Sequence, residues 1–189
     1  MATPTSLKQF SQLLRSSLDM EDLLRTTLER MLAECGAMNL VCYLVGRTGD
    51  YKLGAYINAT VPKDSVETLL DHWAGVIPDR FAETGLAVAT PKNEAERRKF
   101  TDGDPWLRDS HLALIGVDHA QTGLRLGCFQ FSRESKPFSD AEVQGLRDLV
   151  GLFRDQLWRI LTIHNRLKPD FEGTGGLVDG DDDEEQESA

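Results

Sequence analysis

Hydrophobic residues recur at helical spacing along the first third of the chain. Near the N-terminus they lie three and four positions apart, which predicts a short helix built on Leu7, Phe10, Leu13, Leu14 and Leu18. Asp19 follows as an N-cap, and a second helix is expected to run from there to Gly36. A third amphipathic helix is predicted from Asp64 to about Phe81, where Pro78 bends or interrupts it.

Other segments have the pattern of β-strands. Residues 38–47 are almost continuously apolar and β-prone, which predicts a strand in the interior of a sheet, and 51–58 return as its hairpin partner. Further strands are expected at 86–90, 111–118 and 124–133. The order of these elements predicts an α+β fold in which an antiparallel sheet carries helices on one face.

The stretch "PFSDAEVQGL", residues 137–146, marks the start of a long C-terminal helix. Ser139 and Glu142 have the spacing of a capping box, in which each side chain accepts the backbone N–H of the other residue. Phe138 and Val143 flank them as a hydrophobic staple, and Asp140 places a negative charge in the first turn, where the helix dipole favours it. The helix is expected to run from Ser139 to Leu167.

That C-terminal helix has an apolar stripe at heptad spacing, which predicts a homodimer. The a and d positions are Val143, Leu146, Val150, Phe153, Leu157, Ile160, His164 and Leu167. We expect the dimer interface to comprise Val150, Phe153, Leu157, Ile160 and His164. The alternative is a monomer in which Leu7, Phe10 and Leu14 of the N-terminal helix cover the same stripe.

The length and charge of the chain fit one domain with extensions at both ends. The expected parts are an N-terminal helix at 1–18, a domain at 19–167 and a disordered acidic tail at 168–189. From position 170 onward there are nine acidic residues and no basic one, whereas the remaining 22 acids face 21 bases. The tail could solubilise the protein or bind a basic partner.

The same composition argues against several classes of function. The sequence has no basic patch with interleaved aromatic residues, which would indicate nucleic-acid binding, and no run of about 18 apolar residues, which would indicate a membrane span. The N-terminus lacks the features of a signal peptide, so we expect a cytoplasmic protein. Cys35, Cys42 and Cys128 lie in apolar patterns and are expected to be buried thiols, and the scattered histidines predict no metal site.

Two segments together resemble the GAF domain family. They are "DMEDLLRTTLERMLAECGAMNLVCYLV" and the segment from "LALIGV" through "GLRLGCFQFSRESKPFSDAEVQGL". The family signature is matched by Leu126-Gly127, by Arg133 and by Phe138-Ser139 with Glu142. The resemblance covers about residues 19–160. It implies a central antiparallel sheet of about five to six strands, with the terminal helices packed on one face and a helix-and-loop lid, here 64–84 and 91–109, on the other.

The resemblance also implies a function as a small-molecule sensor and dimerisation module. The chain lacks the Cys-His pair of bilin-binding members and matches the cyclic-nucleotide motif poorly. Candidate ligand-binding residues are Tyr43, Tyr56, Trp73, Arg97, Arg98 and Trp106, and the cofactor is unknown. Alternatives are a core position for Trp73, a solvated basic surface around the arginines, a ligand-free adaptor that binds a signalling protein, and a small reductase of the GAF type. No catalytic motif is recognised, so an enzyme is not expected.

Overall fold

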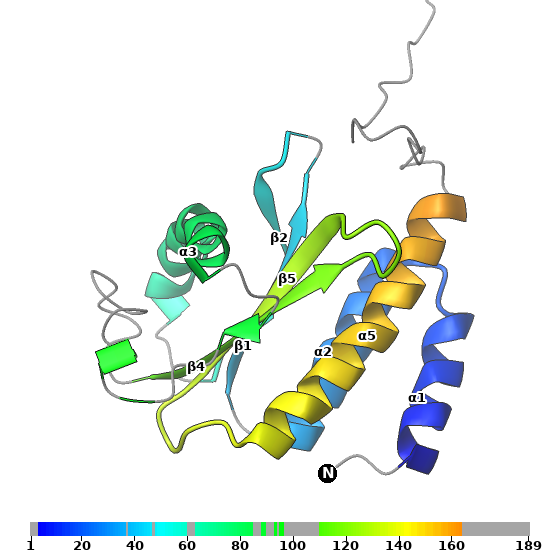
Figure 1. Ribbon diagram of the computed structural model, residues 1–189, viewed down its shortest axis with the longest axis horizontal. Helices are drawn as coiled ribbons and strands as arrows, with labels where there is room; N and C mark the ends of the chain where they lie inside the picture. The colour runs from blue at the N-terminus through cyan, green and yellow to red at the C-terminus, as the bar shows by residue number, and fades with distance from the viewer. Residues whose placement is uncertain are drawn as a thin grey trace, which may run out of the picture.

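A five-stranded antiparallel sheet separates two layers of helices in the computed structural model (Figure 1). The strand order is β2-β1-β5-β4-β3. The strands are β1 Asn39–Val45, β2 Tyr51–Ile57, β3 Val88–Ala89, β4 His111–Asp118 and β5 Arg125–Arg133. The structure describes residues 4–36, 38–46, 48–59, 63–84, 88–89, 93, 95–96 and 110–163. The α+β fold and the antiparallel sheet are those that the sequence predicts.

The described helices lie on both faces of the sheet (Figure 1). The helical layer consists of α1 Pro4–Ser16, α2 Met20–Cys35 and α5 Asp140–Ile163, and α3 Lys63–Thr84 covers part of the opposite face. Asp19 caps α2 by accepting the N–H of Asp22, and Gly36 ends it with a φ of 79°. The predicted helix from Asp64 exists, but it continues through Pro78 to Thr84.

The main hydrophobic core lies between the sheet and the helical layer. Its central contact joins β5 to α5, where the rings of Phe129 and Phe153 meet edge to face with centroids 5.1 Å apart. Both side chains are fully buried. Burial of an apolar side chain of this size stabilises a fold by about 1.5–3 kcal/mol, so this contact contributes strongly to holding α5 on the sheet.

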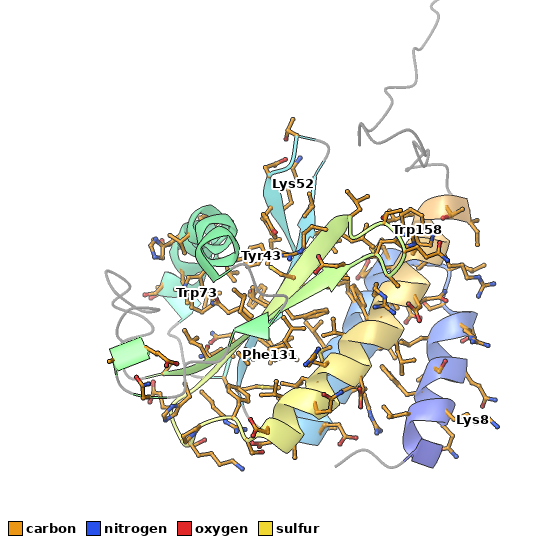
Figure 2. The ribbon with its side chains drawn as sticks, in the orientation of Figure 1. Lys8, Tyr43, Lys52, Trp73, Phe131 and Trp158 are labelled. Carbon is orange, nitrogen blue, oxygen red and sulfur yellow. The ribbon has the colours of Figure 1, made fainter. Side chains whose placement is uncertain are left out.

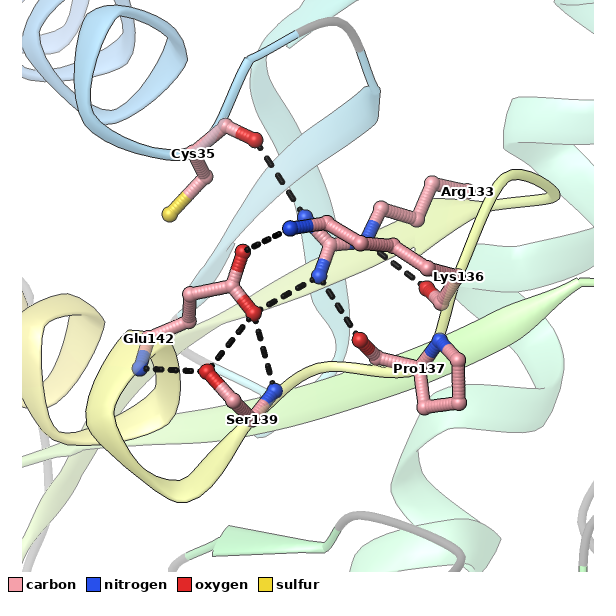
Figure 3. A network of polar contacts seen from close by, with 6 residues as sticks. All are labelled: Cys35, Arg133, Lys136, Pro137, Ser139 and Glu142. Atoms are coloured by element: carbon pink, nitrogen blue, oxygen red, sulfur yellow. Dashed lines mark hydrogen bonds and ion pairs between the residues drawn. The ribbon is translucent and has the colours of Figure 1, made fainter.

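The predicted capping box forms at the start of α5 (Figure 3). The Ser139 N–H donates to Glu142 Oε2 over 2.9 Å, and the Glu142 N–H donates to Ser139 Oγ over 3.2 Å. Arg133, at the end of β5, also donates to Glu142 Oε2 over 2.9 Å. The last strand and the last helix are therefore joined by an ion pair as well as by the chain itself.

The predicted dimer seam on the C-terminal helix is wrong in its choice of residues. Val150, Phe153, Leu157 and Ile160 have exposed fractions of only 0–4% and belong to the core of the chain itself. A partner could not contact them without opening the protein. The stripe is apolar because it packs on the chain's own sheet and helices, and a heptad pattern does not distinguish that packing from packing on a partner. His164 lies outside the described residues.

The N-terminal helix covers part of that stripe, as the alternative prediction had it. Phe10 and Leu14 of α1 are buried in the same core as Phe153 and Leu157, and Leu7 packs against its edge. Two side chains of α5 also hold the end of α1. Gln156 Nε2 donates to the Ser17 carbonyl over 2.5 Å, and a guanidinium nitrogen of Arg159 donates to the Arg15 carbonyl over 3.0 Å.

Candidate functional site

A second, smaller apolar cluster fills the space between the sheet and α3. It contains Val41, Tyr43, Val66, Leu69, Leu70, Trp73, Leu112, Leu114 and Cys128. Tyr43 points from β1 toward α3, and its hydroxyl donates to the Leu70 carbonyl over 2.7 Å (Figure 2). Trp73 is 3% exposed. Tyr43 and Trp73, both predicted as ligand contacts, therefore meet in the core and support α3.

Little free space remains beside this cluster. The cavity lined by β1, β2 and the described part of α3 has a volume of about 10 Å³, with Tyr56 and Trp73 on its wall. One water molecule needs at least about 10–15 Å³, and pockets for small molecules measure about 300–1,000 Å³. This part of the sheet face is consequently closed by the protein's own side chains.

Of the remaining predicted ligand residues, Tyr56 lies in the described part of the chain and shares the wall of this cavity with Trp73. Tyr56 belongs to β2, the strand at one edge of the sheet, and is 47% exposed. Arg97, Arg98 and Trp106 lie outside the described residues, as does most of the predicted loop part of the lid. The helical part of that lid is α3, on the expected face.

Two buried polar side chains on the same face were missed by the sequence analysis. Gln130 and Ser132 of the central strand β5 are 3% and 1% exposed. Gln130 pairs with Val41 and Leu114, which belong to the cluster under α3, so its side chain lies on that face. The signal in the sequence was a glutamine within the apolar segment 126–131, because most buried polar side chains are hydrogen-bonded and a glutamine placed there needs an explanation.

An ion pair lies on the same face where β4 and β5 meet their connecting turn. Arg125 of β5 pairs through Nε with Asp118 of β4, and both side chains are 28% exposed. Tyr51 of β2 forms a hydrogen bond with Arg125, and burial is the main cause of a raised pKa for its hydroxyl. Since Asp118 already balances the charge of Arg125, the pair closes this end of the face rather than leaving an open anion site.

The cysteines are poorly suited to nucleophilic chemistry. Cys42 and Cys128 are fully buried and Cys35 is partly buried, and all three are free thiols. Burial raises the pKa of the Cys42 and Cys128 thiols well above the usual range. A reactive cysteine needs the thiolate form and an exposed, electropositive setting. Within the described ranges, no three side chains of the metal-binding types lie close enough together to hold an ion.

The fold is that of GAF domains of known structure. The GAF domain of a phosphoenolpyruvate-protein phosphotransferase from Acinetobacter matches with a TM-score of 0.63 and 16% identity, over 87% of this chain and 95% of that one. A GAF domain/HD domain protein from Geobacter sulfurreducens matches with a TM-score of 0.58 and 14% identity, over 79% and 98%. The GAF domain of the cyanobacteriochrome TePixJ gives 0.56 and 12%, over 79% and 95%.

These similarities concern the fold and do not identify a ligand for this chain. No family model matches the sequence, and no curated protein matches it either. None of the helices in the described part of the chain is long and apolar enough to span a membrane. The chain thus has a GAF-like α+β fold in which side chains fill the sheet face beneath the part of α3 around residues 66–73.

Proposed function

We propose that this chain is a regulatory module of the GAF type that relays signals through protein contacts rather than through a ligand under α3. The observation that carries the proposal is the filled sheet face. Tyr43, Leu70 and Trp73 occupy the space between β1 and α3 and leave a cavity of only about 10 Å³. A small molecule would have to displace a buried tyrosine and its 2.7 Å hydrogen bond to enter there.

Self-association is the simplest form of such a relay, and the exposed apolar residues suggest where it occurs. Leu13, Leu18 and Ile163 are 51–56% exposed, and all three belong to the helical layer or to its connection. The core stripe of α5 is buried inside the chain, so we propose this outer surface as the place where a homodimer forms. Exposed apolar side chains on one surface are a common feature of protein interfaces.

Sedimentation of the full chain at micromolar concentration tests this proposal. We expect a dimer that Leu18→Glu and Ile163→Glu weaken without lowering the melting temperature, since both residues are exposed. Leu53→Glu is the matched control, because Leu53 is 44% exposed on the edge strand β2 and should leave the dimer intact. A monomer throughout, or equal weakening by all three variants, would refute dimerisation through the helical layer.

Small-molecule sensing is a second candidate, favoured by the buried polar side chains of Gln130 and Ser132 on the same sheet face. Native mass spectrometry of the full-length protein separates the two candidates. A retained small molecule that is lost in Gln130→Leu would favour sensing. A spectrum of protein alone, for the original and for Gln130→Leu alike, would favour the ligand-free module.

A further inference from the structure

The helical layer contains an open groove between α1 and α5, on the face of the sheet away from α3. Its volume is about 430 Å³. The lining residues are Ser11, Leu14 and Arg15 from α1 and Leu152, Asp155, Gln156 and Arg159 from α5. The volume of the groove is thus about forty times that of the cavity beside Tyr56 and lies within the size range of binding pockets.

Two arginines give this α1–α5 groove a positive rim. Arg15 and Arg159 are exposed, one on each wall, and neither forms an ion pair with any acid in the described ranges. Arg159 uses one guanidinium nitrogen to hold the Arg15 carbonyl. The acid on the wall, Asp155, is already engaged by Arg154, whose two guanidinium donors reach the same carboxylate oxygen over 2.7 and 2.9 Å.

We propose that the α1–α5 groove binds the acidic tail of the same chain, residues 179–187. That segment contains seven acids and no base: Asp179, Asp181, Asp182, Asp183, Glu184, Glu185 and Glu187. Arginine guanidinium groups are well suited to carboxylates, because their donors match the two carboxylate oxygens. Leu14 and Leu152 line the groove between the two arginines and add no charge of their own.

The distance between the tail and the groove favours binding within one chain. The groove extends along α5 from Arg159 back to Leu152, which is about 16 Å from Ile163 at a rise of about 1.5 Å per residue. Fifteen residues, 164–178, separate Ile163 from the acidic segment. A random coil of that length has an end-to-end distance of about 20 Å. A linker matched to its span gives an effective concentration in the millimolar range, so weak contacts suffice.

Comparison of NMR amide spectra of the full-length protein with and without the tail charges tests the proposal. In the neutral-tail variant, the seven acids become Asn or Gln. We expect shift differences at the α1 and α5 residues that line the groove. They should shrink between about 20 mM and 300 mM salt, because exposed ion pairs are screened over a Debye length of about 10 Å at 0.1 M.

Charge reversal in the groove is a second test of whether the tail docks there. Each exposed ion pair changes the ratio of docked to free tail by about 1.5- to 5-fold, so Arg15→Glu with Arg159→Glu should lower it about 2- to 25-fold. Converting the seven acids to lysine in that double variant should restore docking. Arg147→Glu is the control, because Arg147 is exposed on α5 outside the groove.

Several results would overturn the proposal. They are identical spectra for the original and neutral-tail proteins, shift differences on another face, and an equal effect of Arg147→Glu. Shift differences that grow with protein concentration would place the tail in the groove of a second copy and would also overturn binding within one chain. None of these outcomes depends on the state of the sheet face under α3. Repeating the comparison with Leu18→Glu and Ile163→Glu in place separates docking of the tail from dimerisation through the helical layer.

Discussion

The ion pair between Arg133 and Glu142 allows a quantitative prediction about how α5 is held. Arg133 is one of the few buried charged side chains in the described structure, with 3% of its side chain exposed. It donates to the carbonyls of Cys35, Lys136 and Pro137 over 2.9–3.2 Å (Figure 3). Its guanidinium also lies 4.1 Å from the ring centre of Phe138. Glu142 is the acid that balances this buried charge.

Glu142→Gln keeps the shape of the side chain and removes its charge. Breaking a fully buried ion pair from one side costs about 3–5 kcal/mol. The Glu142 side chain is 21% exposed and glutamine can still accept the Ser139 N–H, so we expect a loss of about 2–4 kcal/mol. For a domain in the size range of about 150–250 residues, this lowers the melting temperature by roughly 4–16 °C. Urea unfolding followed by circular dichroism measures the loss.

The pH dependence provides an independent check on the cause. The hydrogen bond from Arg133 is the main reason why the pKa of Glu142 is well below its usual range. A lowered pKa in the folded state gives stability above the unfolded pKa of about 4.3, and that stability is lost as the pH falls below this value. The difference between original and variant should therefore be largest near neutral pH and should shrink toward pH 3.

Glu134→Gln is the matched control, since Glu134 is exposed in the turn after β5 and should change stability by less than about 0.5 kcal/mol. An equal loss in the two variants would show that the Arg133 pair is not the cause. A loss from Glu142→Gln that stays constant between pH 7 and pH 3 would also refute the electrostatic explanation.

Three further predictions concern the core. Gly127→Ala should destabilise the protein strongly, because a Cβ there would lie 2.3 Å from the Tyr43 carbonyl oxygen. Gly145→Ala in α5 should instead stabilise it by about 0.5–1 kcal/mol, because a Cβ at that position meets nothing within 4 Å. Thermal melts compare the two variants. Leu157→Ala should lower the free energy of unfolding by about 2–5 kcal/mol at every protein concentration, as expected of a core residue. A loss of stability seen only at high protein concentration in denaturation curves would instead place Leu157 in a dimer interface. Cys128 should react with a thiol reagent only as fast as the protein unfolds, and rapid labelling of the native protein would contradict its burial.

The local features of the fold could be predicted from the sequence because they depend on neighbouring residues. The caps at Asp19 and Ser139 and the helix end at Gly36 form as predicted, since a side chain and an amide three positions away are always within reach. The strands β1, β2, β4 and β5 lie where apolar and alternating patterns placed them. The resemblance to GAF domains predicted the same fold as the structural comparison.

Only the tertiary structure decided what covers each apolar surface. The stripe through Phe153 and Leu157 has the same spacing whether it faces a partner or the chain's own sheet, and it faces the sheet and α1. Tyr43 and Trp73 were predicted as ligand contacts, but in the structure the hydroxyl of Tyr43 bonds to the Leu70 carbonyl and the indole of Trp73 is buried beside a cavity of only about 10 Å³. The groove between Arg15 and Arg159 joins residues 144 positions apart. Periodicity is a property of neighbouring residues, whereas contact between distant segments depends on how the whole chain fills space.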